Sequence, residues 1–442
     1  MAVVVVFLVF VPIAAICFAR LPLRSAILTV LIGGWWLLPV GHYSPGGVGT
    51  SLPWWITGTA LPSDMLLTKA WIPPLVSVLG GALRDWESVR TWRPEAIDAP
   101  MAFWCVWPLL DGFGGAPTPA PWLATLYICG SWGLPWLIGR LWFAGRDGCL
   151  SLTRAIAFSG LANLPVAVIE GTRPPMLYGL IYGPHPFRFD GIARFVGYRP
   201  IGFLEHGNLY GLWTAIAAFA AVWLVGDRGR KGGGWIALAI ANVVVMLASQ
   251  STGAIILFVV GLAVLAMWRS RDFPVLMVVV AVALLLVGAI HLSGVVPLQA
   301  IARSPAGENV IGMMRATGRG SFLWRVSQDT KTLASIHAHL IGGTAQWDWW
   351  RPYRTRPWGQ PFLLIGQYGV VGLLLAWGSL LGACIAAFAR LRKWQNRLAG
   401  DAALALALVV LIALADATLN AFFFSPAILA AGAIAGWPMM RR

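Results

Sequence analysis

The 442-residue chain is 58% hydrophobic and only 11% charged, and its mean hydropathy is +0.74. Soluble domains carry about a quarter charged residues, so this balance excludes a water-soluble enzyme, a disordered scaffold, a collagen-like fibre and a disulfide-stapled secreted module. The net charge of +15 must therefore be interpreted by its position relative to a membrane, and it does not by itself indicate nucleic-acid binding.

Apolar stretches of about 20 residues, the length that crosses about 30 Å of hydrocarbon, recur along the whole chain. They predict an all-α, polytopic integral membrane helical bundle of about 11 to 14 transmembrane helices. The first stretch has no basic residue before Arg20, so we expect a retained span and not a cleaved signal. The third is the weakest, because Lys69 lies inside it and Pro73-Pro74 interrupts it. The predicted spans are residues 1–19, 25–40, 66–82, 99–115, 120–138, 151–169, 208–226, 234–249, 253–268, 274–292, 362–388, 402–418 and 420–437.

Short basic connections fall on one side of the membrane if the helices alternate, and the positive-inside rule makes that side cytoplasmic. Two long polar connections, residues 170–207 and 293–361, then lie on the opposite face. The second is long enough that we expect short helices within it. The chain divides into N-terminal helices (1–169), central helices with the first outward loop (170–292), the large outward loop (293–361) and C-terminal helices (362–442).

The five cysteines are scattered without a C-x-x-C motif or a neighbouring His, so they predict neither a disulfide framework nor a metal site. Two helical G-x-x-x-G pairs, Gly378 with Gly382 and Gly432 with Gly436, predict close helix packing.

Both outward loops are rich in Arg, although exported loops usually avoid it. A guanidinium binds phosphate through two parallel hydrogen bonds, so the pattern predicts a phosphate or pyrophosphate presented by a lipid. The competing interpretation is that loops longer than about 60 residues escape the charge bias and carry ordinary solvated side chains. The outward basic residues include Arg194, Arg199, Arg303, Arg315, Arg319, Arg325, Lys331, Arg351, Arg354 and Arg356.

Several short motifs follow one another between residues 190 and 375, and their order and spacing carry more weight than any one of them. They are the Arg-rich stretch 194–199 leading to Gly207-Asn208, Leu247–Ala254 (LASQSTGA), Ser321–Arg325 (SFLWR), Leu340–Gly343 (LIGG) and Gly366–Gly372 (GQYGVVG). In this order they resemble the O-antigen ligase and O-antigen polymerase superfamily of polytopic bacterial glycosyltransferases.

The resemblance implies a bacterial inner-membrane protein with its active site at the periplasmic face and a long periplasmic loop. Such enzymes take a glycan from undecaprenyl pyrophosphate without a cofactor, nucleotide sugar or metal. The glycan passes to another lipid-linked repeat in a polymerase, our first expectation here, or to a lipid A core sugar in a ligase. The resemblance assigns the catalytic pyrophosphate contacts to Arg194 or Arg199 in the first loop and to Arg325, with Arg319 as its alternative, in the second.

Two positions depart from the family pattern. Family members often have Arg where this chain has Thr252, and commonly a His where this chain has Trp358. That His is the usual candidate for activating the acceptor hydroxyl, so a general base cannot be transferred to this chain.

The remaining substrate-binding candidates each have a structural alternative. His206 could hydrogen-bond a sugar or cap the helix that contains Asn208, and the Trp residues could stack on sugar rings or anchor the chain at the interface. Asp416 and Asn420 lie in or near spans, so each should face a partner or water. The candidates are His206, Asn208, Trp347, Arg351, Arg354 and Trp358.

The expected partners are the lipid-linked glycan, its acceptor and membrane lipids, and no nucleic acid. Two other functions remain open from the sequence. A flippase for the same lipid-linked glycans should have broken, charged helices around a central cavity, whereas the polar residues here gather in two loops. The second of these functions is that of a non-catalytic assembly partner of the polysaccharide machinery.

Overall fold

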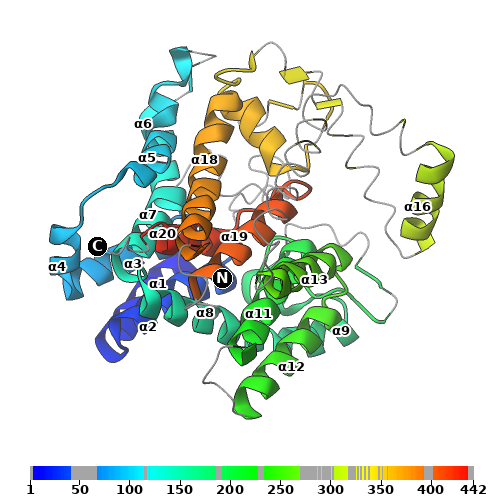
Figure 1. The fold of residues 1–442 in the computed structure, drawn as a ribbon, viewed down its shortest axis with the longest axis horizontal. Coiled ribbons are helices and arrows are strands. Elements are labelled where there is room, and N and C mark those ends of the chain that lie inside the picture. The colour runs from blue at the N-terminus through cyan, green and yellow to red at the C-terminus, as the bar shows by residue number, and fades with distance from the viewer. Residues whose placement is uncertain are drawn as a thin grey trace.

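The structure is a computed structural model, and its described parts contain helices as their regular elements, joined by loops (Figure 1). One isolated antiparallel bridge, between Ala193 and Tyr198, is the only strand-like pairing in these parts. They comprise residues 3–40, 67–113, 117–118, 120–185, 192–194, 196–226, 233–268, 303–316, 339–346, 349–350, 352–355, 357–392 and 402–436, with the positions 286, 290, 300, 325, 328, 331–332 and 335–336.

The helices follow the apolar runs of the sequence. In the first half they are α1 (Val3–Arg20), α2 (Leu23–Leu37), α3 (Ile72–Arg84), α4 (Trp86–Thr91), α5 (Ala99–Val106), α6 (Pro121–Ile128), α7 (Leu134–Trp142), α8 (Arg146–Leu161), α9 (Leu164–Thr172) and α10 (Leu177–Tyr182). In the second half they are α11 (Gly207–Gly226), α12 (Gly233–Ala248), α13 (Thr252–Met267), α16 (Pro305–Ala316), α18 (Gln360–Arg392), α19 (Ala402–Ala417) and α20 (Ser425–Ala435). The helix α16 lies in the large outward loop, as expected of a short helix there.

Three described helical stretches are long and apolar enough to cross a membrane, judged by length and composition: residues 146–172, 207–226 and 360–391. Further helices of 10–17 residues are equally apolar but shorter. Helices that are apolar on all sides must be buried in protein or in lipid. The helical architecture predicted from hydropathy is therefore confirmed, together with several candidate membrane spans.

One apolar core reaches from Ala14 to Ala435 and draws on helices from both ends of the chain. At its centre α11 is buried on nearly all sides, where it packs against α8, α12, α13 and α19. The helices α7 and α20 also pack closely against each other. A Cβ added at Gly432 would lie 2.2 Å from the Trp136 carbonyl oxygen, so glycine permits this approach.

One of the two expected G-x-x-x-G contacts is confirmed. Gly432 and Gly436 both face the segment that contains α7, with Trp136 and Ala144 as their neighbours. Gly378 and Gly382 have no described atom within 4 Å of an added Cβ, so the described residues do not show the packing predicted at that pair. Small residues permit a close approach, but a partner helix must also be present.

The expected span at 66–82 begins six residues later than predicted. The helix α3 starts at Ile72, so Pro73 and Pro74 occupy its first turn. A first-turn proline costs no hydrogen bond, because the first N–H groups of a helix have no intrahelical partner. Lys69 precedes the helix, and its charge is not inside a span.

The expected span at 420–437 is also shorter, because α20 begins only at Ser425. Residues 420–424 join α19 to α20 without helical structure, although they are buried and, apart from Asn420, apolar. Hydropathy cannot distinguish a buried non-helical segment from a helix, so the sequence misplaced this boundary. As a result, Asn420 lies at a break between two apolar helices.

Other predicted spans are interrupted or lie outside the described residues. The run 99–115 continues from α5 into two short 3-10 helices, and 120–138 contains a π-helical turn at Cys129–Gly133 between α6 and α7. Gly369 breaks α18 with φ +73°. Most of the expected span at 274–292 lies outside the described residues.

Candidate functional site

Arg194 and Arg199 lie on the two sides of a tight turn in the first outward loop. Ala193 bridges to Tyr198, and the Arg194 N–H donates to the Gly197 carbonyl at 2.9 Å. The turn requires glycine, because Gly197 has φ +66° and an added Cβ would lie 2.1 Å from a carbonyl oxygen of Gly171. The turn therefore fixes both arginines relative to the end of α9.

Gln250, in the connection between α12 and α13, holds this turn against the helix bundle. Its Nε2 donates to the Val196 carbonyl at 2.6 Å, and its Oε1 accepts from the Val196 N–H at 3.4 Å. The next residue, Ser251, precedes α13. The Ser-Gln-Ser-Thr-Gly motif thus lies directly beneath the Arg-bearing turn.

Glu170, near the end of α9, anchors the loop from the other side. Its side chain is fully buried. One carboxylate oxygen accepts the N–H groups of Met176 and Leu177, and the other accepts those of Ile201 and Gly202, at distances of 2.7–3.1 Å. A single carboxylate thus satisfies four backbone donors and ties together the two ends of the first outward loop.

Arg199 is buried, with only 6% of its surface exposed. Its Nη2 donates to the Asn208 Oδ1, in the first turn of α11, and to the Ser251 hydroxyl at 3.1 Å. Both acceptors are neutral, so these two contacts orient the guanidinium without neutralising its charge. Two helix starts, those of α11 and α13, therefore position the Arg199 side chain.

Arg325, from the large outward loop, reaches the same place. Its Nη1 donates to the Asn420 Oδ1 at 2.6 Å, and that oxygen also accepts from the Asn208 Nδ2 at 3.0 Å. The guanidinium carbon lies 5.0 Å from the centre of the Trp358 ring, within the range of a cation–π contact. Arg199 and Arg325 are thus joined through the amides of Asn208 and Asn420.

The Asn420 amide has an unambiguous orientation in this network. Its Nδ2 donates to the Asp416 Oδ1 at 2.9 Å, so its oxygen must face Arg325 and Asn208. The sequence predicted that Asp416 faces a partner or water. The structure gives its carboxylate a hydrogen bond to Asn420, and through that amide a connection to Arg325.

His206 caps α11. Its Nδ1 accepts the Asn208 N–H at 2.9 Å, and its ring stacks on Phe422 with 5.1 Å between centroids. Burial lowers the pKa of His206 well below its usual value, and the positive charges of Arg199, Arg325 and Arg194 lower it further. The imidazole is therefore neutral near pH 7 with its proton on Nε2, and the helix-cap interpretation is confirmed.

The positive charges that lower the pKa of His206 belong to arginines that the sequence analysis singled out. Arg194, Arg199 and Arg325 come from two separate loops, yet each acts electrostatically on His206. Arg194 is half-buried, and its Nε has no hydrogen-bond acceptor among the described residues. Of the four predicted catalytic arginines, the hydrogen bonds of the described residues therefore bring two, Arg199 and Arg325, into one network.

Two further motifs quoted from the sequence meet through their backbones. The N–H groups of Thr344 and Ala345 donate to the carbonyls of Gly366 and Gln367 at 2.8 and 2.9 Å. Added Cβ atoms at Gly343 or Gly369, both at positive φ, would lie 2.4 Å or less from facing backbone. The Leu-Ile-Gly-Gly and Gly-Gln-Tyr-Gly segments thus form one junction between the large loop and α18.

The other predicted substrate-binding residues are placed differently or not described. Arg354 is exposed in a turn, with φ +50°. Trp358 is 8% exposed and packs beneath Arg325, so its ring is no open platform for a sugar in this arrangement. Arg319, Trp347 and Arg351 lie outside the described residues.

The sequence missed a buried ion pair next to the site. Glu205, which precedes His206, lies 3.1 Å from the Lys69 Nζ. Burial raises the pKa of Glu205 and lowers that of Lys69, while their mutual attraction opposes both shifts. The sequence did contain a sign of this ion pair, because Lys69 interrupts an apolar run and a buried cation requires a partner.

Across the described part of the chain, no group of three or more His, Cys, Asp or Glu side chains is arranged to hold a metal ion. No protein-family model matches this chain, and no curated protein matches it either.

Proposed function

We propose that this chain is a polytopic inner-membrane glycosyltransferase, similar to the O-antigen ligase and polymerase superfamily, that uses undecaprenyl-pyrophosphate-linked oligosaccharide as its donor. The observation that carries the proposal is the convergence of Arg199 and Arg325 on the Asn208–Asn420 amide pair. Two guanidinium groups from separate loops suit the two phosphates of a diphosphate.

The arrangement of the motifs gives independent support. The segments that carry the resemblance lie in different parts of the sequence, yet Arg199 contacts Ser251, and Thr344 contacts Gly366. A chance similarity gives no reason for these segments to be neighbours. The positive-inside rule places the loops at the periplasmic face.

In the reaction, the acceptor hydroxyl oxygen forms a bond to the anomeric carbon of the donor sugar. The bond from that carbon to the diphosphate oxygen breaks, and its electron pair leaves with the diphosphate. Arg199 and Arg325 stabilise the charge that develops on the leaving group, which accelerates the step only because that charge grows in the transition state.

The hydroxyl proton passes to water or to the departing diphosphate, and no side chain is assigned as its base. The His206 Nδ1 is occupied by the Asn208 N–H, so this nitrogen is not available to accept it. Polymerase and ligase differ only in the acceptor. We favour the polymerase, because the acceptor-activating His of the family is replaced by Trp358.

A flippase for the same lipid-linked glycan is the second candidate. The non-helical segment 420–424 and the break at Gly369 favour it, since transporters often bind substrate at interrupted helices. Both functions need the arginines to hold the pyrophosphate. They differ in whether the bond from the sugar to the diphosphate is broken.

The test uses the purified full-length chain with undecaprenyl-pyrophosphate oligosaccharide in detergent. A transferase releases undecaprenyl pyrophosphate and yields a longer or transferred glycan, whereas a flippase leaves the donor intact. Arg325→Lys should lower turnover about tenfold, because losing one charge-assisted hydrogen bond costs about 1.5 kcal/mol.

Arg303→Lys is the matched control, because Arg303 is an exposed arginine of the same loop with no assigned role. It should retain full turnover. If Arg199→Lys and Arg325→Lys also retain full turnover, the site is wrong even if the transferase activity is present.

A further inference from the structure

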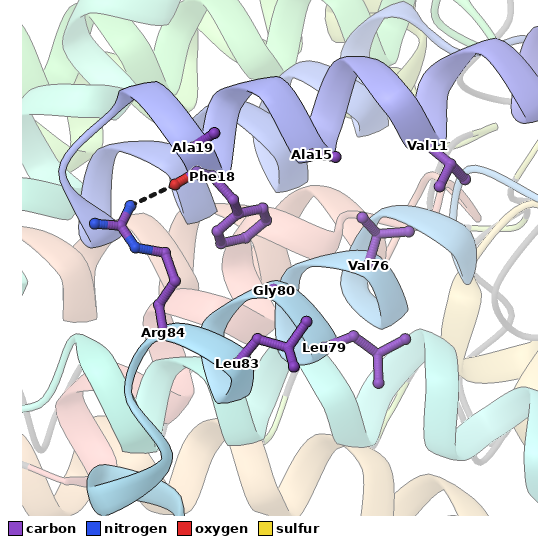
Figure 2. Close-up of a pocket in the computed structure, with 9 residues that line it drawn as sticks. All are labelled: Val11, Ala15, Phe18, Ala19, Val76, Leu79, Gly80, Leu83 and Arg84. Carbon is purple, nitrogen blue, oxygen red and sulfur yellow. Dashed lines mark hydrogen bonds between the residues drawn. The ribbon is translucent and has the colours of Figure 1, made fainter.

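A groove with a volume of about 590 Å³ runs between α1 and α3. Figure 2 shows Val11 and Phe18 of α1 along one side, Leu79 and Leu83 of α3 along the other, and Arg84 at one end. All the side chains that line it are apolar except Arg84. The groove therefore has apolar walls along its length and one basic end, which is formed by Arg84.

Arg84 is held at that end by one carbonyl in the last turn of α1 and one just after it. Its Nη1 donates to the carbonyl oxygens of Phe18 and Leu21, both at 2.6 Å. Carbonyls at a helix C-terminus lack intrahelical donors, so this contact caps α1 and fixes the guanidinium. In Figure 2 the other terminal nitrogen points away from the Phe18 carbonyl. No other acceptor for this guanidinium is found among the described residues, so its remaining N–H groups can bind an anion.

The surface around the groove is apolar and exposed. Leu8 and Ile16 on α1 are 66% and 61% exposed, and Leu79 and Leu83 on α3 are 55% and 88% exposed. Patches of this kind are stable when hydrocarbon covers them. Covering an apolar groove with hydrocarbon removes its surface from water, so the acyl chains of a surrounding bilayer are its natural occupant.

The length of the groove fits one lipid leaflet. Its α1 wall runs from Val11 to Ala19, which is about 12 Å of helix at 1.5 Å per residue. Half of a hydrocarbon core of about 30 Å is slightly longer than this. A single acyl chain that starts at Arg84 therefore stays within one leaflet.

The charges near Arg84 favour an anionic headgroup. Arg20 ends α1 directly before Leu21, whose carbonyl Arg84 binds, and Arg24 follows three residues later in the first turn of α2, where its Nε donates to the Trp142 carbonyl. The neighbouring Asp85 carboxylate accepts from Ser88 and from the Trp142 indole N–H. That carboxylate is therefore oriented toward other partners.

We propose that this groove binds one acyl chain of an anionic glycerophospholipid whose phosphate contacts Arg84. The inference rests on the membrane placement in the proposed function and is independent of glycosyl transfer. Because α1 ends at the basic side of the bundle, the lipid belongs to the cytoplasmic leaflet, on the face opposite to Arg199 and Arg325.

The test is native mass spectrometry of the purified full-length chain, titrated with phosphatidylglycerol or with phosphatidylcholine of the same acyl chains. We expect the wild type to retain phosphatidylglycerol about fivefold better, the effect of one arginine near a phosphate. Arg84→Gln should abolish this preference. Ala15→Phe should reduce retention of both lipids, because Ala15 is an exposed residue of the groove wall and the added ring fills it.

Two matched variants serve as controls. Arg90→Gln removes an exposed arginine of α4, and Ile16→Phe adds a ring on α1 outside the groove. Neither should change lipid retention. Equal retention of the two lipids by the wild type, or full retention by Ala15→Phe, would overturn the inference.

Alkaline carbonate extraction of cell membranes separates this failure from failure of the membrane placement. If carbonate releases the chain, both the placement and the groove inference are wrong. If the chain stays in the membrane but shows no lipid preference, only the groove inference is wrong.

Discussion

Lys69 and Glu205 form a buried ion pair with 3.1 Å between Nζ and Oε1, and their side chains are 1% and 6% exposed. Lys69 also donates to the carbonyl of Phe203 at 3.1 Å. The pair connects the segment before α3 to the loop that carries His206 at the start of α11. It therefore fixes that loop from the N-terminal part of the chain.

We predict that Lys69→Met destabilises the protein by about 3–5 kcal/mol, because it leaves the Glu205 carboxylate buried without its cation. The double variant Lys69→Met, Glu205→Leu should recover most of this loss, since no unpaired charge then remains. Thermal unfolding of both variants, followed by tryptophan fluorescence, measures the difference. A double variant as unstable as Lys69→Met would show that the charge is not the cause.

His185 is affected by the charge of Lys69 in this ion pair, and we predict that it lowers the stability of the protein at acidic pH. Burial and the nearby charge of Lys69 lower the pKa of His185 to about 4, against the hydrogen bond to the Leu204 carbonyl, which raises it. The unfolded chain then takes up a proton as pH falls from about 6.5 to 4, and the folded chain does not. Stability is therefore constant above pH 6.5 and falls by up to about 3 kcal/mol on acidification.

The variant His185→Asn isolates this effect, because an amide can still donate to the Leu204 carbonyl but does not titrate. The melting temperature of the wild type should fall more steeply between pH 6.5 and 4.5 than that of His185→Asn. Glu205 does not obscure the comparison. Its raised pKa contributes with the opposite sign, and it is present in both proteins. Parallel pH profiles would show that His185 does not carry the dependence.

Long apolar runs allowed the helices to be predicted closely. The run predicted at 208–226 forms α11 at Gly207–Gly226, because every face of this helix is apolar and no proline interrupts it. The segment 420–424 could not be predicted in the same way. Its Phe-Phe-Phe run is as apolar as a membrane helix, and its non-helical path depends on burial against other parts of the chain.

The site was predictable in its charges but not in its connections. The density of Arg in two loops predicted an anionic partner, and the resemblance assigned its contacts to Arg194 or Arg199 and to Arg325 or Arg319. The sequence gave no indication that Asn208 and Asn420 join them, because hydrogen-bond partners are set by tertiary packing. Trp358 occupies a position where the family suggested a catalytic group, and only the structure places it beneath Arg325.

The buried Glu170 should be essential to the first outward loop. Glu170→Gln replaces one acceptor oxygen by an NH2 group that would face two backbone N–H donors, at a cost of about 2–4 kcal/mol. Limited proteolysis should then cut the loop between residues 173 and 202 faster than in the wild type. Glu87→Gln, at an exposed glutamate of α4, is the control and should leave the cleavage rate unchanged.

The junction between the large loop and α18 predicts a further sensitivity. Gly369→Ala places a methyl group against the Ile341 carbonyl at a position with φ +73°, so it should destabilise the junction by about 2 kcal/mol or more. Gly378→Ala, in the same helix, meets open space and should be neutral or slightly stabilising. Melting temperatures of the two alanine variants compare the sites directly, and equal values would contradict the described contact.

Asn420 should position Arg325, and a change of charge there should affect ligand binding more than folding. Asn420→Asp keeps the shape and the acceptor oxygen, but its carboxylate neutralises the guanidinium and faces Asp416. We expect it to weaken binding of undecaprenyl pyrophosphate by at least about tenfold, because the local charge that attracts the diphosphate is lost. Asn420→Leu should weaken binding less, since Arg325 retains its charge but loses one acceptor.

Asn242→Leu is the matched control for this pair, because Asn242 is also a buried amide and bonds only to the Ala157 and Leu238 carbonyls among its described acceptors. It should lower the melting temperature but leave the affinity of the folded protein unchanged. Binding measured at a temperature where every variant is folded separates the two effects. If Asn242→Leu weakens binding as much as Asn420→Asp, the loss reflects general destabilisation, and Asn420 does not act through the charge of Arg325.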